Sequence, residues 1–146
     1  MNWTDYFMGL ARHVATKSKD RSTKVGCIIV GPDNEIRSTG YNSFPRGIDD
    51  ENEERHQRPL KYKWTEHAER NAIYNAARMG TPLKGCRMYL PWFPCMDCAR
   101  AVVQSGISQL VCTAPDLDNP TWGDDFRNAL VLFEEAGTEL QFVSLV

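Results

Sequence analysis

The chain has 146 residues and a mass of 16.6 kDa, a length that supports one domain with a sizeable core. Hydrophobic residues make up 42% and charged residues 25%, which excludes a disordered chain, a collagen-like repeat and a coiled coil. The formal net charge is −2, so the chain has no overall excess of basic residues to bind nucleic-acid phosphates, which disfavours a nucleic-acid-binding protein. The N-terminus does not read as a signal peptide, and no apolar run approaches the ~20 residues of a membrane span. We therefore expect a single domain over residues 1–146, cytoplasmic, with reduced thiols and no membrane partner.

The first part of the chain predicts a helix followed by an antiparallel pair of strands. Apolar residues recur there at the i, i+3, i+4, i+7 spacing of a helix: Phe7, Leu10, Ala11 and Val14. Thr4 is a candidate cap for that helix. Residues 25–30 form an apolar run of strand length, residues 31–34 have the composition of a turn, and residues 36–42 can return as the second strand.

Residues 43–63 differ from the rest of the chain because charged residues crowd there without apolar periodicity. A loop of roughly 20 residues in a compact domain is typically functional or mobile. Two interpretations stay open for it, a solvated insertion and a binding segment.

The second part of the chain alternates helices and strands. Ala68, Ala72 and Ala76 give a helix one face of small residues, and Thr65 is its candidate cap. The further expected elements are a strand at 86–90, a helix from Pro94 to Gly106, a strand at 107–113, a helix ending at Gly137 and a strand at 139–143. Strands joined through helices run parallel, so we expect a three-layer α/β fold with a mixed five-stranded sheet covered by helices on both faces.

Two short motifs at predicted helix starts carry the chemistry, His67-Ala68-Glu69 and Pro94-Cys95-Met96-Asp97-Cys98. A helix start stabilises thiolates, and two cysteines three residues apart can bind one ion together. His67 would be a third ligand, and three protein ligands with an open fourth position are typical of a catalytic zinc. Glu69 is too close to His67 to be a comfortable fourth ligand, and is placed to exchange protons with a zinc-bound water. H-x-E followed by P-C-x-x-C is the signature shared by zinc deaminases.

Other interpretations of these residues exist. A C-x-x-C alone also occurs as a redox dithiol, and H-x-E alone is common by chance. The remaining cysteines, Cys27, Cys86 and Cys112, lie in predicted strands, where a free cysteine usually packs as a small hydrophobe. His13 and His56 are predicted to be ordinary surface or partly buried histidines.

Several segments spread over nearly the whole chain match one family. They are Ser18-Lys19-Asp20 with Lys24-Val25-Gly26, Gly40-Tyr41-Asn42 with Phe44-Pro45-Arg46-Gly47, residues 67–73, residues 94–99 and Ala136-Gly137. The chain resembles the cytidine deaminase superfamily and, within it, the deoxycytidylate (dCMP) deaminases. The zinc motifs are specific to the superfamily, and the Gly-Tyr-Asn segment and the charged insertion favour the dCMP branch.

The resemblance implies a three-layer cytidine-deaminase-like fold and a reaction. His67, Cys95 and Cys98 would hold one Zn²⁺ per chain, and Glu69 would shuttle protons during hydrolytic attack on C4 of cytosine. Ammonia leaves and uracil remains. The expected substrate is dCMP, a small molecule, and the resemblance implies a homo-oligomer.

The resemblance also suggests substrate contacts. The backbone at Ala68 would hold the pyrimidine edge, Asn42 would hydrogen-bond the sugar, and Ser18 and Arg46 are candidates for the phosphate end. Trp92 and Phe93 could stack on the base or could equally be core aromatics at a strand end.

One departure from the family keeps other substrates open. Residues 114–122 contain no Lys, Arg or Tyr and are partly acidic, which would be unfavourable beside a phosphate. A cytosine nucleoside, a free base or a modified cytosine is therefore an alternative substrate. A nucleic-acid base deaminase of the tRNA adenosine type is a second alternative, which the absence of a basic excess disfavours. A zinc-stabilised binding domain is the non-enzyme alternative, although such a site has no need for Glu69.

Overall fold

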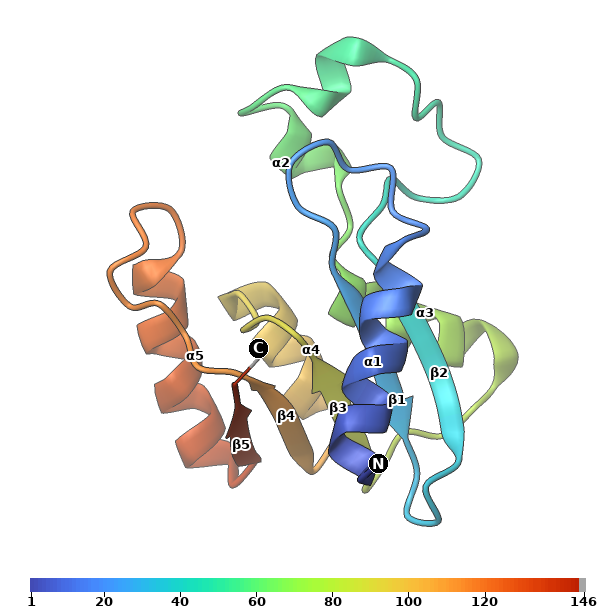
Figure 1. Cartoon of the computed structure of the whole chain (residues 1–146). Coiled ribbons are helices and arrows are strands. Elements are labelled where there is room, and N and C mark those ends of the chain that lie inside the picture. The colour runs from blue at the N-terminus through green and yellow to red at the C-terminus, as the bar shows by residue number, and fades with distance from the viewer. Residues whose placement is uncertain (145–146) are drawn as a thin grey trace.

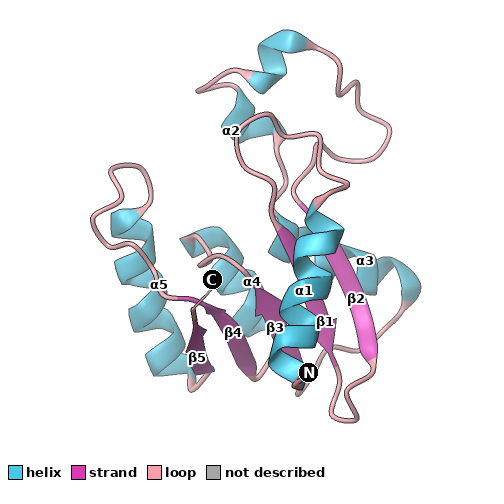
Figure 2. Ribbon diagram, in the orientation of Figure 1, coloured by secondary structure: helices cyan, strands magenta, loops and turns pink. Residues whose placement is uncertain are grey.

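A mixed five-stranded sheet forms the centre of the computed structural model, which describes residues 1–144 (Figures 1 and 2). The strand order is β2-β1-β3-β4-β5. The strands are β1 (Gly26–Val30), β2 (Ile36–Tyr41), β3 (Arg87–Leu90), β4 (Gln109–Thr113) and β5 (Glu139–Val143). β1 is antiparallel to both β2 and β3, whereas β3, β4 and β5 run parallel. The predicted mixed sheet of five strands is confirmed.

Helices cover both faces of the sheet, as predicted. On one face α1 (Trp3–Ala15) lies across β1 and β3, where Phe7 and Ala11 are fully buried (Figure 1). The other face carries three helices, α3 (Ala68–Met79), α4 (Met96–Gln104) and α5 (Gly123–Ala136). The larger core lies between these three helices and the sheet, and it contains the buried Cys27, Cys86 and Cys112 as predicted.

Helix α3 approaches the sheet unusually closely because both surfaces are small. A Cβ on Gly40 of β2 would lie 2.3 Å from the backbone nitrogen of Ala72, a distance that a side chain cannot tolerate. The alanine face of α3 is fully buried at Ala68 and Ala72. This close contact sets the position of the α3 start, which carries the first of the two motifs.

Two predicted helix caps are wrong. The first helix begins earlier than expected, and Asn2 rather than Thr4 caps it by accepting the backbone N–H of Asp5 at 2.8 Å. Thr65 is the C-terminal cap of a short preceding helix, and His67 occupies the N-cap position of α3. Periodicity shows which residues face the core, but it does not show on which turn a helix starts.

Residues 43–63 are not an unstructured loop throughout. They contain a 3₁₀ turn, η1 (Glu53–His56), and the first residues of the short helix α2 (Lys61–Trp64). Ion pairs rather than an apolar face tie this insertion to the loop after α1, which explains why no periodicity marks it. The pairs are Lys19–Asp50, Arg21–Glu53 and Lys61–Asp20. In Figure 1 the insertion stands above the sheet at the end where β3 and β4 finish.

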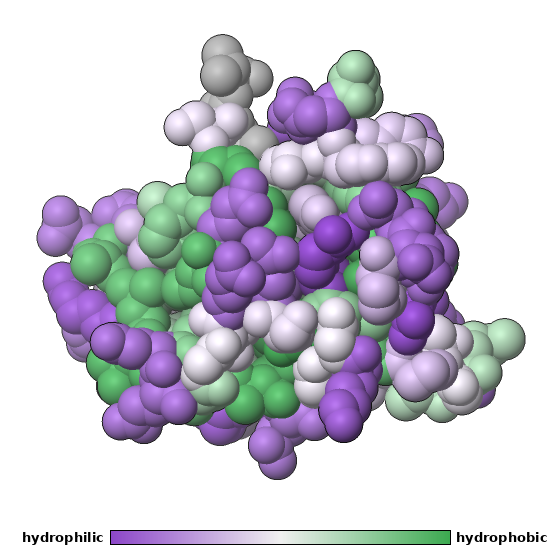
Figure 3. All heavy atoms as spheres, turned by 90° about the horizontal axis from the view of Figure 1, so that it is seen from below, coloured by the Kyte–Doolittle hydropathy of each residue, from purple (hydrophilic) through white to green (hydrophobic). Residues whose placement is uncertain are grey.

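The opposite end of the molecule is seen in Figure 3, where hydrophobic residues gather at the left, the side of β5 and α5 in Figure 1. Val131 and Phe142 are both about half exposed.

Within residues 1–144, no helix combines the length and the apolar character needed to cross a bilayer.

Candidate metal and active site

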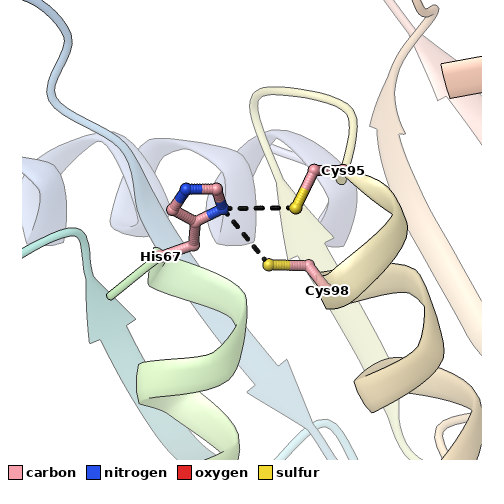
Figure 4. Close-up of side chains that lie close together, drawn as sticks. All are labelled: His67, Cys95 and Cys98. Atoms are coloured by element: carbon pink, nitrogen blue, oxygen red, sulfur yellow. Dashed lines mark hydrogen bonds between the residues drawn. The ribbon is translucent and has the colours of Figure 1, made fainter. Parts of the chain in front are cut away.

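The two sequence motifs come together at the starts of two neighbouring helices. His67 is the N-cap residue of α3, Cys95 is the N-cap residue of α4, and Cys98 lies in the first turn of α4. The Nδ1 atom of His67 lies 3.4 Å from the Sγ atom of Cys95 and 3.4 Å from that of Cys98 (Figure 4). Among residues 1–144, these three form the one group of His, Cys and acidic side chains arranged to hold a metal ion.

The distances fit a zinc ion. Tetrahedral coordination with ordinary zinc–sulfur and zinc–nitrogen bonds places sulfur and nitrogen ligands about 3.6 Å apart. Two sulfurs and one imidazole nitrogen are a zinc donor set, and three protein ligands leave one position open, as in catalytic sites. The three side chains point toward one another from the starts of the two helices (Figure 4), and their donor atoms lie within 4.8 Å of one another.

The three ligand groups also interact through their protons. The Cys98 thiol donates a hydrogen bond to Cys95 and, together with His67, holds the pKa of Cys95 at about 4. The same hydrogen bond raises the pKa of Cys98. The Cys95 sulfur in turn raises the pKa of His67. The cluster therefore holds protons that a divalent cation would displace, since zinc binds thiolates and neutral imidazole.

Glu69 lies one residue inside the start of α3 and only 3% of it is exposed. Burial raises the pKa of this carboxyl above its ordinary value. It lines the same cavity as His67 and Cys95. A carboxyl that is buried, close to the metal ligands and above its ordinary pKa is suited to taking up and releasing a proton.

The cavity beside the cluster has a volume of about 120 Å³. Its floor is apolar and buried, with Ala68 and Phe93 nearly inaccessible to solvent. The insertion contributes Arg58, Lys61 and Tyr62 to the lining, and the start of α5 contributes Trp122. This lining joins segments that are far apart in the sequence at the carboxyl ends of parallel strands, a common place for ligand sites.

Lys61 is the buried cation of this cavity. Its ammonium group lies 3.1 Å from both carboxylate oxygens of Asp20, and the residue is only 8% exposed. Asp20 also accepts the backbone N–H groups of Ser22 and Thr23. A lysine has three N–H donors, so Lys61 keeps hydrogen-bonding capacity toward the cavity while Asp20 fixes its position.

The predicted substrate residues are divided between the cavity and its surroundings. Ala68 and Asn42 line the cavity. The Asn42 amide already bonds two backbone groups, accepting from Val25 and donating to Thr23, so its position is tightly fixed. Ser18 is buried and donates its hydroxyl to the carbonyl of Asn42, which places it behind that residue.

Arg46 is not brought to this cavity. Its guanidinium donates to the side chain of Asn75, and it lines a second cavity of about 220 Å³ between the insertion and α3. Of the two predicted aromatic residues, Phe93 is buried in the core against Phe126, and Trp92 is 41% exposed. Both border the metal-side cavity; Phe93 is a core aromatic as one interpretation had it, and stacking on the base stays a prediction for both residues.

Sequence reasoning missed four residues of the cavity lining, Arg58, Lys61, Tyr62 and Trp122. Arg58 and Lys61 were visible only as two of several cations in the insertion, and Tyr62 and Trp122 carried no motif. The signal that could have ranked Lys61 is Asp20, a carboxylate in the preceding loop, but their pairing spans 41 residues.

Comparison with known proteins agrees with the geometry. Residues 1–114 match the family described as the cytidine and deoxycytidylate deaminase zinc-binding region. A protein of Aliivibrio fischeri named "Uncharacterized deaminase in luxG 3'region" is 37% identical over 144 residues, covering 98% of this chain and 95% of that protein. Human deoxycytidylate deaminase is 35% identical over 142 residues, covering 94% of this chain and 77% of the human protein.

A solved structure shares the fold over almost the full length. It is the dCMP deaminase of cyanophage S-TIM5 in complex with dCMP and dUMP, with a TM-score of 0.77, 22% identity and 95% of each chain covered. The shared fold, the family match and the His67, Cys95 and Cys98 cluster converge. The chain belongs to the zinc-binding cytidine and deoxycytidylate deaminase family.

Proposed function

We propose that this protein catalyses the hydrolytic deamination of a cytosine mononucleotide, dCMP to dUMP and ammonia. The observation that carries the proposal is one cavity that joins the His67, Cys95 and Cys98 cluster and the buried Glu69 to two cations, Arg58 and Lys61. The first four residues fit deamination of a base. The two cations fit the phosphate of a nucleotide.

His67, Cys95 and Cys98 would hold the zinc ion. When bound, zinc supplies a Lewis acid that makes water nucleophilic at neutral pH. The Glu69 carboxylate accepts a proton from the attacking water and delivers a proton to the amino group that leaves C4 as ammonia. Water and cytosine are consumed and uracil and ammonia are formed, so Glu69 ends in its starting state. Its burial keeps bulk water away from this transfer.

The cavity orients the rest of the substrate. Ala68 is the first residue of α3, and its backbone N–H belongs to the first turn, which has no partner within the helix. That N–H would donate to the pyrimidine edge, and Asn42 beside it would hydrogen-bond the sugar. Lys61 and Arg58 would bind the phosphate. Ser18 would act by fixing Asn42, through its hydrogen bond to the Asn42 carbonyl.

The acidic segment does not oppose a phosphate in this arrangement. Asp116 and Asp118 are exposed, and Trp122 is the residue of segment 114–122 that lines the cavity. The carboxylate of Asp116 accepts the backbone N–H of Asp118 and stays within its own turn. Segment 114–122 therefore does not count against a monophosphate, and Asp20, the carboxylate that does line the cavity, is paired with Lys61.

The cellular setting of the enzyme stays a prediction. The homo-oligomer implied by the family resemblance also stays a prediction.

The test is one assay series with the zinc-loaded protein. Ammonia release is followed with dCMP, CMP, deoxycytidine, cytidine, cytosine and a tRNA anticodon stem as substrates. We expect dCMP to give the highest kcat/KM. A preference for deoxycytidine would refute the monophosphate, activity on the anticodon stem would favour a nucleic-acid deaminase, and inactivity on every substrate would favour a binding domain.

A further inference from the structure

The segment that leads into α5 is folded by its own polar side chains. The backbone N–H of Asn119 donates to the carbonyl of Asp116, and the Asn119 side chain accepts the N–H groups of Thr121 and Trp122 at 2.9 Å each. Gly123 follows, where a Cβ would lie 2.5 Å from the carbonyl oxygen of Leu117. These contacts fix the position of the chain just before α5.

This segment contacts both helices that carry the metal ligands. The indole of Trp122 lies edge-on to the imidazole of His67, with ring centroids 6.0 Å apart and an interplanar angle of 81°. Three residues later, the Asp125 carboxylate accepts the backbone N–H of Met96 at 3.2 Å. Met96 lies between Cys95 and Cys98, so the hydrogen bond acts on the turn that supplies both sulfurs.

The structure shows why α4 needs a partner there. The N-cap residue of a helix normally supplies a side-chain acceptor for the first turn. Cys95 occupies that position, and its side chain makes no capping hydrogen bond within the described chain. A sulfur that binds a metal is directed at the metal and cannot also cap the helix. Asp125 on α5 provides a carboxylate acceptor at this helix start instead.

We propose that Asp125 is a positioning residue for the metal site, holding the Cys95–Cys98 turn by accepting the Met96 N–H in place of a local cap. The inference rests on the proposed metal-dependent function but makes a separate claim about how the site is held. Groups that orient metal ligands commonly change metal affinity by about 10- to 100-fold when they are removed.

The neighbouring acid offers a matched control. Asp124 occupies the same first turn of α5, but its side chain is 97% exposed and pairs with Arg127 on the same helix. Substitution of either acid removes one carboxylate from the same helix start. Only Asp125 touches the ligand turn.

The experiment uses the zinc-loaded full chain and three variants, Asp125→Ala, Asp125→Asn and Asp124→Asn. Zinc release into excess chelator is timed with a metal-sensitive dye. The Co²⁺-substituted proteins are compared by their thiolate-to-cobalt absorption, and kcat and KM for dCMP are measured in parallel. We expect Asp125→Ala to release zinc at least about tenfold faster and to change the cobalt spectrum. Asp125→Asn keeps an acceptor oxygen and should rescue most of the effect, and Asp124→Asn should match the wild type within about twofold.

Each outcome decides the matter. If Asp125→Ala releases zinc at the rate of Asp124→Asn with an unchanged spectrum, the positioning role is refuted. If Asp125→Ala does not fold, the test rests on Asp125→Asn. A wild-type zinc release rate and cobalt spectrum in Asp125→Asn would then support the role of Asp125 as a hydrogen-bond acceptor. If Asp125→Asn also fails to fold, that role is refuted. If the wild type binds zinc here but deaminates none of the cytosine substrates, the proposed function fails, while the release rates still test Asp125. If the wild type binds no zinc, both fail.

Discussion

Lys61 gives the sharpest test of the substrate assignment, because it is the buried cation of the cavity lining and Asp20 holds it in place. We consider Lys61→Met, which keeps the length of the side chain and removes the ammonium group. In the wild type this group lies 3.1 Å from the carboxylate oxygens of Asp20 and faces the metal-side cavity. Its remaining N–H groups would bind the phosphate of dCMP.

The size of the effect follows from the number of bonds lost. One hydrogen bond between charged groups contributes about 1.5–3 kcal/mol, which corresponds to an approximately 10- to 150-fold loss of kcat/KM for dCMP. Deoxycytidine has no phosphate, so its kcat/KM should change by less than about threefold. The variant also loses stability, by about 1–3 kcal/mol, because Asp20 is left without its cation. Asp20 keeps the N–H groups of Ser22 and Thr23, so the protein should still fold.

The assay compares kcat/KM for dCMP and deoxycytidine in the wild type, Lys61→Met, Lys61→Arg and Lys63→Met. Lys63 is the exposed lysine of the same short helix, so its variant controls for the loss of a positive charge. Lys61→Arg should retain most of the preference for dCMP. An equal loss on both substrates in Lys61→Met, or no loss on either, would contradict a phosphate at Lys61.

Three further predictions concern catalysis, binding and pH. Glu69→Gln should retain zinc and lose about 10²- to 10⁴-fold in kcat, measured by ammonia release, and undiminished turnover would remove Glu69 from the proton pathway. Trp122 lines the cavity, and we expect its ring to contact bound dCMP, so Trp122→Ala should raise KM for dCMP by about 3- to 10-fold, whereas Trp122→Phe should retain most of the affinity. Burial raises the pKa of Asp20, but its backbone hydrogen bonds and Lys61 outweigh burial and lower it below the ordinary 3.8. The stability from Asp20 is therefore fully present above about pH 4 and is lost as the pH falls through its lowered pKa, so acid unfolding followed by circular dichroism should be less steep in Lys61→Met.

The N-cap residues of the helices could not be predicted from the nearby sequence alone. Asn2 and Thr4 are both good capping residues, and Asn2 forms the cap by accepting the backbone N–H of Asp5. Similarly, Thr65 precedes a helical pattern, but His67, a predicted metal ligand, takes the N-cap position of α3. Composition alone does not choose between neighbouring candidates for a cap.

The cations of the insertion show the same limit for the substrate site. Nothing in the sequence distinguishes three cations of the insertion, Arg46, Arg58 and Lys61. Arg46 nevertheless lines the second cavity, whereas Arg58 and Lys61 line the cavity beside the metal cluster. The difference arises from ion pairs such as Lys61–Asp20, which join residues 41 positions apart. No periodicity or motif records such a pairing, because its energy depends on two loops folding against each other.

The sequence by itself determined the sheet and the metal cluster of this protein, and it predicted Glu69 as the residue that we propose transfers protons. His67, Glu69, Cys95 and Cys98 were predictable because metal binding requires particular donors at spacings set within one helical turn. Only the tertiary structure decided which residues face the substrate and which hold the metal turn. Lys61 and Asp125 each act through a partner distant in the chain, so their roles exist only once the insertion and α5 have packed around the site.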